Sequence, residues 1–230
     1  MKLTSGYIIS LLGIWLLVHP ALSQGKKYLP SQFKLGTDLS YLGSSLLTKG
    51  KKLYEFNADI DFNRFIITGD YGFANWEFTD TDFEYKNTGS YYRIGLDYNF
   101  MKSAPENNAI YIGFKYAGTN FTENFSYYVE DPFFGNYTSE ILDLKRNGMW
   151  LEFVAGMKVR VWKGLFFGWT GRFKFASSIS SPPSTFNNFW IPGYGKTTKD
   201  SSWGLNYQIF YSIPLFKKHW APPEETKENE

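Results

Sequence analysis

The chain has 230 residues, a formal net charge of +2, no cysteine, and aromatic residues at 20% of its composition. The near-neutral charge gives no reason to expect nucleic-acid binding, and the lack of cysteine excludes disulfides and an acylated N-terminal cysteine. High aromatic content with a slightly negative mean hydropathy indicates that apolar and polar residues alternate along the chain instead of clustering.

The first residues have the pattern of a secretory signal peptide. Lys2 precedes an apolar run at residues 7–18, and Ala21 and Ser23 supply the small residues that a signal peptidase recognises. The apolar run is short for a membrane anchor, and no later run is long enough for a transmembrane helix. We therefore expect a signal peptide at residues 1–23.

Eight stretches alternate apolar and polar residues with a period of two, which is typical of strands with one apolar and one polar face. The last is the clearest, with Phe210 as the one apolar residue on its polar face. Tilted strands of about ten residues with aromatic ends have the length that crosses a bilayer. The stretches are Phe33–Tyr41, Tyr54–Phe62, Phe65–Phe73, Tyr92–Phe100, Ile110–Tyr116, Met149–Val159, Leu165–Phe175 and Trp203–Leu215.

The connections between these stretches alternate in length. The first, third, fifth and seventh are long, including Glu77–Gly89, Gly118–Asn147 and Ser177–Ser201, and the others are short. Outer-membrane barrels have long extracellular loops and short periplasmic turns, with both termini in the periplasm. A soluble sandwich or lipocalin-like barrel would turn its apolar face inward and needs no such alternation.

We therefore predict an all-β protein, an eight-stranded antiparallel transmembrane β-barrel of the bacterial outer membrane, at residues 24–216. A polar, proline-containing tail at residues 217–230 is expected to be disordered in the periplasm.

The predicted register places charged side chains in the lumen of the barrel. Acidic residues fall mainly on the first four strands and basic residues mainly on the last four. An eight-stranded barrel is just wide enough for side chains to fill it. We therefore expect the two walls to pair and plug the lumen, with inward glycines making room for long basic side chains. The predicted network is Asp38, Glu55, Asp59, Asp61, Asp70, Arg93, Asp97, Lys115, Glu152, Lys158, Arg160, Arg172 and Lys174.

The histidine count argues against catalysis. His19 lies in the signal peptide and His219 follows the last strand on the periplasmic side, so neither can act as a general base at the outer rim. The same count argues against a metal site of the usual kind. The acidic residues at 80, 82 and 84 lack the glycine that a calcium loop needs for its sharp turn. We predict no catalytic residue, no metal and no cofactor.

Aromatic residues crowd the third and fourth long connections. Exposed aromatics at this density mark either a contact surface or a cap folded over the barrel mouth. We favour a surface for a partner, formed by Phe125, Tyr127, Tyr128, Phe133, Phe134, Phe189, Trp190 and Tyr194.

One segment supports a family resemblance. Ile191 to Lys196 reads Ile-Pro-Gly-Tyr-Gly-Lys and precedes the last strand, Trp203–Leu215. With these features, the mature chain resembles a family of small, uncharacterised outer-membrane barrels of Bacteroidota, a domain of unknown function. The resemblance implies the barrel fold and carries no catalytic residues. The polar tail after Phe216 departs from the commonest barrel pattern, which ends on an aromatic residue.

Three functions from different classes remain. The favoured hypothesis is a non-enzymatic accessory or scaffold subunit, surrounded by outer-membrane lipid and docked to other outer-membrane proteins or lipoproteins, for example in a protein assembly or export machine. The alternatives are a narrow channel and a lipid-modifying enzyme, the latter disfavoured by the missing histidine.

Overall fold

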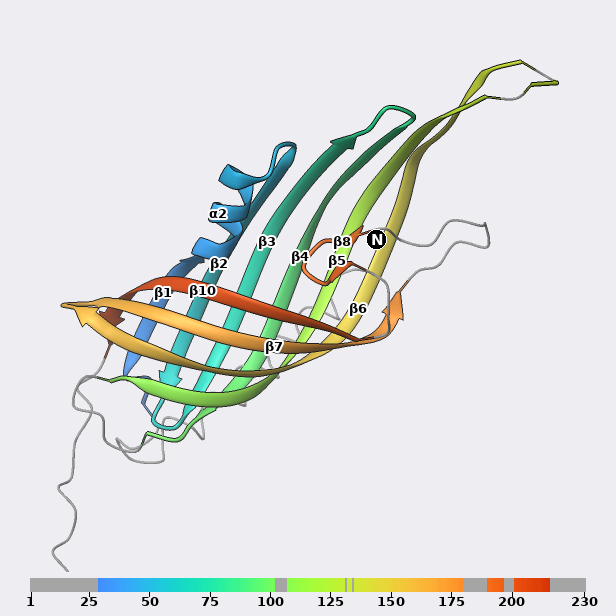
Figure 1. The fold of residues 1–230 in the computed structure, drawn as a ribbon. Coiled ribbons are helices and arrows are strands. Elements are labelled where there is room, and N and C mark those ends of the chain that lie inside the picture. Colours follow the sequence, from blue (N-terminus) through green and yellow to red (C-terminus); the bar gives the residue numbers. More distant parts are fainter. Residues whose placement is uncertain are drawn as a thin grey trace, which may run out of the picture.

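The structure, a computed structural model, describes residues 29–101, 107–130, 132–133, 135–179, 190–196 and 201–215. The chain forms a closed antiparallel barrel with the strand order β1-β10-β7-β6-β5-β4-β3-β2, which confirms the predicted eight-stranded barrel (Figure 1). The predicted signal peptide and tail lie outside the described residues. The strands are β1 (Gln32–Asp38), β2 (Lys51–Phe62), β3 (Phe65–Thr79), β4 (Phe83–Asn99), β5 (Ala109–Val129), β6 (Tyr137–Trp162), β7 (Leu165–Ile179) and β10 (Ser201–Pro214).

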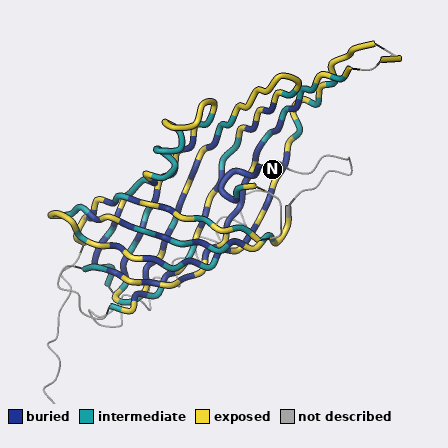
Figure 2. The backbone as a smooth tube through the Cα atoms, in the orientation of Figure 1, coloured by how far each residue is buried: buried dark blue, intermediate teal, exposed yellow. Residues whose placement is uncertain are grey.

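The barrel has an apolar outer face and a polar interior. Successive residues alternate between exposed and buried along the strands (Figure 2). Large apolar side chains such as Phe56, Ile94 and Phe114 point outward and are exposed, whereas charged side chains such as Glu55 and Arg93 are buried inside. A lipocalin-like barrel has the opposite arrangement. A closed strand ladder with an apolar outer surface is the arrangement that lipid requires, and the barrel is therefore of the transmembrane type.

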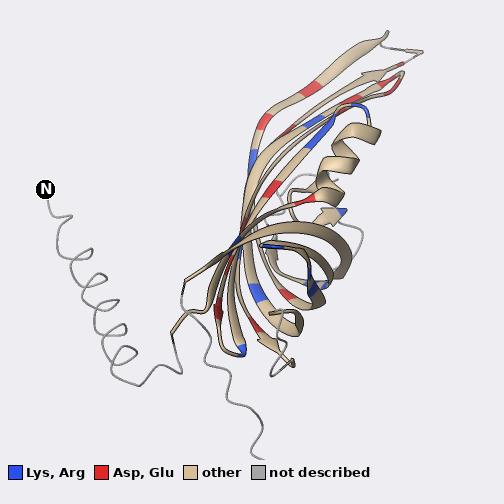
Figure 3. Cartoon of the chain, turned by 90° about the vertical axis from the view of Figure 1, so that its left-hand side faces the viewer, with Lys and Arg blue, Asp and Glu red and all other residues tan. Residues whose placement is uncertain are grey.

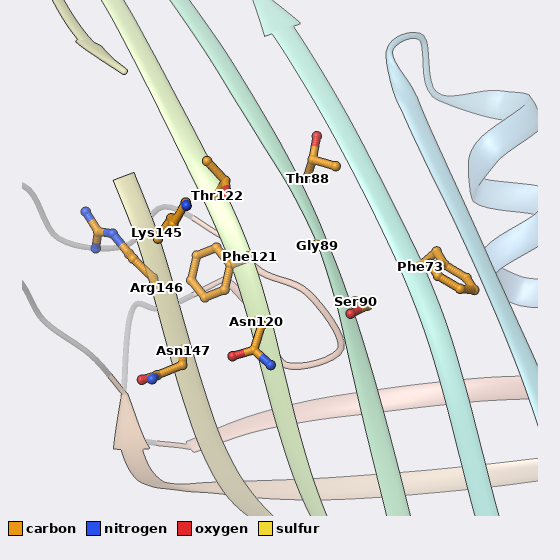
Figure 4. A pocket seen from close by; sticks show the side chains of 10 residues that line it. All are labelled: Phe73, Thr88, Gly89, Ser90, Asn120, Phe121, Thr122, Lys145, Arg146 and Asn147. Atoms are coloured by element: carbon orange, nitrogen blue, oxygen red, sulfur yellow. The ribbon is translucent and has the colours of Figure 1, made fainter. Parts of the chain in front are cut away.

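The outer face changes from apolar to polar at a similar level on the long strands. Ser90, Asn120 and Asn147 stand in direct cross-strand register, immediately beyond Tyr92 and Met149. With Thr88 and Thr122 they line a shallow outer recess of about 550 Å³ (Figure 4). We call the apolar surface below this level the apolar band. It extends to the end of the barrel that carries the tight turns at 63–64 and 163–164, which we call the turn end.

The strands continue well beyond the apolar band, and here the predicted loops are wrong. The expected loop Glu77–Gly89 reduces to a turn at 80–82 between β3 and β4, and the expected loop Gly118–Asn147 is mostly strand. The reason is that strand pairing persists after the outward residues become polar, which removes the apolar alternation from the sequence. We call residues 119–147 of the β5–β6 hairpin the arm; it projects furthest from the barrel in Figure 1.

A helix, α2 (Leu39–Leu47), replaces the expected end of the first strand and the loop after it. Its N-cap is Asp38, whose carboxylate accepts hydrogen bonds from the backbone N–H groups of Ser40 at 2.7 Å and Tyr41 at 3.1 Å. No helix within the described ranges is long and apolar enough to cross a membrane. Because β1 stops at the pair Asp38–Gln208, α2 stands in the gap between the upper parts of β2 and β10. We call this gap the seam.

Candidate functional site: the filled lumen and the arm

Oppositely charged side chains fill the middle of the lumen. Arg93 binds Glu55 through Nη1 at 2.5 Å and Glu152 through Nε at 2.9 Å. Arg172 binds Glu152 at 3.0 Å and lies 3.4 Å from Asp70. These residues lie on β2, β3, β4, β6 and β7, and Figure 3 shows acidic and basic positions on many strands of the barrel. Three acids and three bases balance in this central network: Glu55, Asp70, Glu152, Arg93, Lys115 and Arg172.

Neutral donors complete the hydrogen bonding of the three carboxylates. The Tyr91 hydroxyl donates to Glu55 at 2.6 Å, the Trp150 indole N–H donates to Glu152 at 2.7 Å, and an Asn57 N–H donates to Asp70 at 2.8 Å. A buried ion pair offsets its desolvation cost only when such additional hydrogen bonds are present. The network is therefore a packed interior held by specific contacts.

Two further ion pairs occupy the turn end of the lumen. Lys34 pairs with Asp61 at 2.5 Å, and Lys158 of β6 pairs across the barrel with Asp59 of β2 at 2.5 Å. The Lys158 ammonium also lies 5.0 Å from the centre of the Phe210 ring. A Cβ atom at Gly36 would lie 2.4 Å from this ring. Phe210, the apolar exception on its strand's polar face, therefore fills the lumen where a glycine leaves room.

The structure buries the predicted network residues except Arg160, which is half-buried near the turn end. Asp38 differs from the expected role, because it caps α2 and accepts a hydrogen bond from Asn206 in place of an ion pair. Lys174 donates to backbone carbonyls. Asp97 is buried beside Gly113, with no ion pair to it among the described residues.

A segment between β7 and β10 enters the barrel from the end opposite the turns. It contains the short strands β8 (Trp190–Ile191) and β9 (Gly195–Lys196), and we call residues 190–196 the inserted segment. The Gly193 carbonyl accepts hydrogen bonds from Arg93 at 3.0 Å and from Lys174 at 2.8 Å. The inserted segment therefore covers the central network and is held by its cations.

Three residues predicted to contact a partner lie inside the molecule. Trp190 and Tyr194 belong to the inserted segment and are buried, and Phe125 is buried with its ring 5.1 Å from that of Tyr85. The physical reason is that aromatics inside the barrel mouth offer them an apolar site: Tyr194 packs edge-on against Trp150 at 5.6 Å. For the inserted segment the structure therefore agrees with a cap folded over the barrel mouth, which was the alternative to a contact surface for a partner.

The predicted contact residues that remain exposed lie on the arm. Phe133 at the tip is 90% exposed, Tyr128 is exposed and Tyr127 is half-buried. Phe134 and Phe189 lie outside the described residues. Leu142, which the sequence did not single out, is also exposed on the arm because β6 continues there as a strand.

The arm also presents a strand edge. On one side, β5 and β6 pair as far as Val129–Tyr137. On the other side, β7 pairs with β6 only from Gly148, so residues 137–147 have no second strand neighbour within the part of the chain that the structure describes. Unpaired edges of this kind are templates for the addition of a strand from another chain.

The described residues contain no group of three or more His, Cys, Asp or Glu side chains that could hold a metal ion. Both histidines lie outside the described residues. The described polar side chains of the lumen form ion pairs and hydrogen bonds, and the arm offers apolar contacts and backbone hydrogen bonds.

A family model described as a domain of unknown function, DUF6048, matches residues 19–218. No curated protein matches the chain. Similar solved structures include the N-terminal β-barrel domain of Pseudomonas aeruginosa OprF, at 10% identity and a TM-score of 0.41, covering 80% of this chain and 98% of that one. The attachment invasion locus protein Ail of Yersinia pestis is similar at 11% identity and a TM-score of 0.41, and the match covers 80% of this chain and 100% of Ail. Neisserial surface protein A is similar at 12% identity and a TM-score of 0.32, and the match covers 80% of this chain and 95% of that protein. At these scores the fold assignment rests on the strand topology.

Proposed function

The chain belongs to the DUF6048 family of unknown function, and we propose that it is a non-enzymatic, non-conducting anchor of the bacterial outer membrane that docks another protein through its arm. The observation that carries the proposal is the arm itself. It projects beyond the other strands, carries at residues 137–147 an edge with no second strand neighbour among the described residues, and exposes Phe133 at its tip. A strand edge with nearby apolar side chains provides both the hydrogen bonds and the buried area that a protein partner uses.

The orientation in this proposal places the turn end in the periplasm and the arm outside the cell. The signal-peptide pattern at residues 1–23 supports export from the cytoplasm. Bacterial barrels carry their short turns on the periplasmic side and their longer extensions outside. The partner would then be another outer-membrane protein or a surface lipoprotein, with this chain as an accessory subunit.

The filled lumen argues against the channel alternative. A conducting barrel needs a continuous water-filled path, whereas here the central network and the inserted segment follow one another along the axis. Opening a path would require separating buried ion pairs, which costs several kcal/mol for each uncompensated charge (about 3–5 kcal/mol). The enzymatic alternative lacks a histidine base in the described lumen, and the carboxylates of the central network are engaged in ion pairs there.

A shortened arm tests the proposal. Tyr127 and Ser139 are directly opposite in the hairpin, so residues 128–138 can be replaced by Asn-Gly, the preferred two-residue turn. The tagged wild-type protein, extracted in mild detergent, is expected to co-elute with a stoichiometric partner that mass spectrometry identifies. The shortened variant should elute alone while still folding.

Two outcomes would overturn the proposal. A wild-type protein that elutes only with detergent would remove the docking role altogether. A partner that co-elutes equally with both proteins would show that the arm is not the docking element. A Lys163→Ala variant, which changes an exposed residue at the turn end and leaves the arm intact, serves as the matched control.

A further inference from the structure

The seam leaves a recess in the barrel wall. The pairing of β1 with β10 ends at Asp38–Gln208, and its pairing with β2 ends at Thr37–Phe56. Beyond these pairs, the edges of β2 and β10 face α2 in place of a strand. A recess of about 500 Å³ lies there, bordered by β10, by the first residues of β2 and by the inserted segment.

The inner side of this recess is positively charged. Lys51, Lys174 and Lys196 line it, and none of the described residues that line it is acidic. Lys174 is already engaged by the carbonyls of Gly193 and Tyr194. The recess therefore holds positive charge that an anion would stabilise.

Aromatic rings hold Lys51 in place at the edge of the recess. Its ammonium lies 5.2 Å from the centre of the Trp76 ring and 5.6 Å from that of Trp190. These cation–π contacts position the amine without neutralising it. Lys51 is thus presented to the recess by the same inserted segment that covers the lumen.

The outer side of the recess is apolar. Trp203, 78% exposed, and Leu205 line it from the outward face of β10. The helix α2 lines the recess through Tyr41, and Leu46 and Leu47 at its far end are 88% and 89% exposed. The outer face of β10 changes from the apolar Leu205 and Trp203 to serine at Ser201. The recess therefore opens sideways at the level where lipid headgroups meet acyl chains.

We propose that the seam binds a membrane lipid with an anionic headgroup, whose phosphate lies between Lys51 and Lys196 and whose acyl chain follows Trp203 and Leu205. Lysines next to exposed apolar side chains fit an amphiphile better than a soluble anion, because a soluble anion would make no favourable contact with the exposed Trp203 and Leu205. The inference requires the membrane placement of the barrel, and it is independent of docking through the arm.

The experiment is native mass spectrometry of the detergent-solubilised protein titrated with phosphatidylglycerol or with phosphatidylcholine of the same acyl chains. The wild type is expected to retain phosphatidylglycerol preferentially. The double variant Lys51→Gln/Lys196→Gln should lose about five-fold in affinity for each lysine removed, because that is the contribution of one basic side chain near an anionic lipid surface.

Two variants control for folding and for charge. Lys51→Arg/Lys196→Arg keeps both charges and should retain the lipid. Lys145→Gln/Lys163→Gln removes two exposed lysines outside the seam, one on the arm and one at the turn end, and should leave binding unchanged. A heat-dependent gel shift reports that each variant is folded.

Three results would overturn the assignment. Equal retention of the two lipids would show that the site does not discriminate between headgroups by their charge. An equal loss in the Lys145/Lys163 control would show a non-specific charge effect. Displacement of the bound lipid by inorganic phosphate alone would identify a site for a soluble anion in place of a lipid.

Discussion

The lumen and the arm are built from the same two strands, β5 and β6, yet they use opposite physical means. In the lumen, Lys115 of β5 and Glu152 of β6 are buried in a charge network in which Asp70 and Arg172 are fixed partners. In the arm, β6 has β5 as its one strand neighbour among the described residues, and Phe133 is exposed. The comparison indicates that the contacts that stabilise the fold are concentrated inside the barrel, whereas the outer part of the arm is held by few of them.

The largest expected effect comes from removing the centre of the network. Glu152→Ala leaves Arg93 and Arg172 without their shared carboxylate and Trp150 without its acceptor. Breaking a buried pair in this way costs about 3–5 kcal/mol. Unfolding in denaturant, in detergent micelles, should show this loss, whereas Glu140→Ala in the arm should change the unfolding free energy by less than about 0.5 kcal/mol. Equal losses would contradict the comparison.

A second variant pair separates charge pairing from packing. Lys158→Met leaves the Asp59 carboxylate buried without its ion-pair partner and should destabilise the barrel by about 3 kcal/mol. Adding Asp59→Leu removes the unpaired buried charge. Replacement of both partners of a buried ion pair by apolar residues is often neutral, so most of the lost stability should return. The same unfolding titration measures both variants. A double variant that is less stable than the single would show that the pair is stabilising in itself.

A smaller effect is expected at the inserted segment. Gly193 has a φ of +78°, and a Cβ atom there would lie 2.6 Å from the Tyr91 ring. Gly193→Val should cost about 1–3 kcal/mol through backbone strain and expel the segment from the lumen. The chain has no cysteine, so Ile191→Cys, buried in the parent fold, reports this by faster maleimide labelling in the Gly193→Val background. Unchanged labelling would mean that the segment stays in place.

The smallest effect on stability is expected from shortening the arm. Replacement of residues 128–138 by Asn-Gly removes only exposed or half-buried side chains among those described. Surface changes away from packed contacts stay within about 0.5 kcal/mol. The unfolding midpoint of the shortened variant should therefore match that of the wild type, and a clear loss would show that the arm supports the barrel.

The sequence predicted the barrel well because apolar and polar residues alternate wherever a strand passes through lipid. The same alternation placed Glu55, Arg93 and Arg172 in the lumen, where the structure brings them together. Above the apolar band this signal ends, since outward residues such as Asn120 are polar there, and the arm was therefore taken for a loop. For the inserted segment the sequence left a cap over the barrel mouth as the alternative to the favoured contact surface, because an aromatic residue that is buried and one that binds a partner have the same sequence pattern.

The helix α2 could have been found from local signals. Asp38 is a favourable N-cap, and Leu39, Leu42 and Leu46 follow at helical spacing. The two-residue alternation of β1 continued formally to Tyr41 and concealed the change of structure. The missed helix matters because it creates the seam.

The most direct test of a barrel that anchors without conducting is single-channel recording of the purified protein in planar bilayers. The filled lumen predicts no conductance above that of protein-free membranes, for the wild type and also for Gly193→Val, in which the central network remains. Long-lived conductance steps in the wild type would contradict the account and make the lumen the functional site.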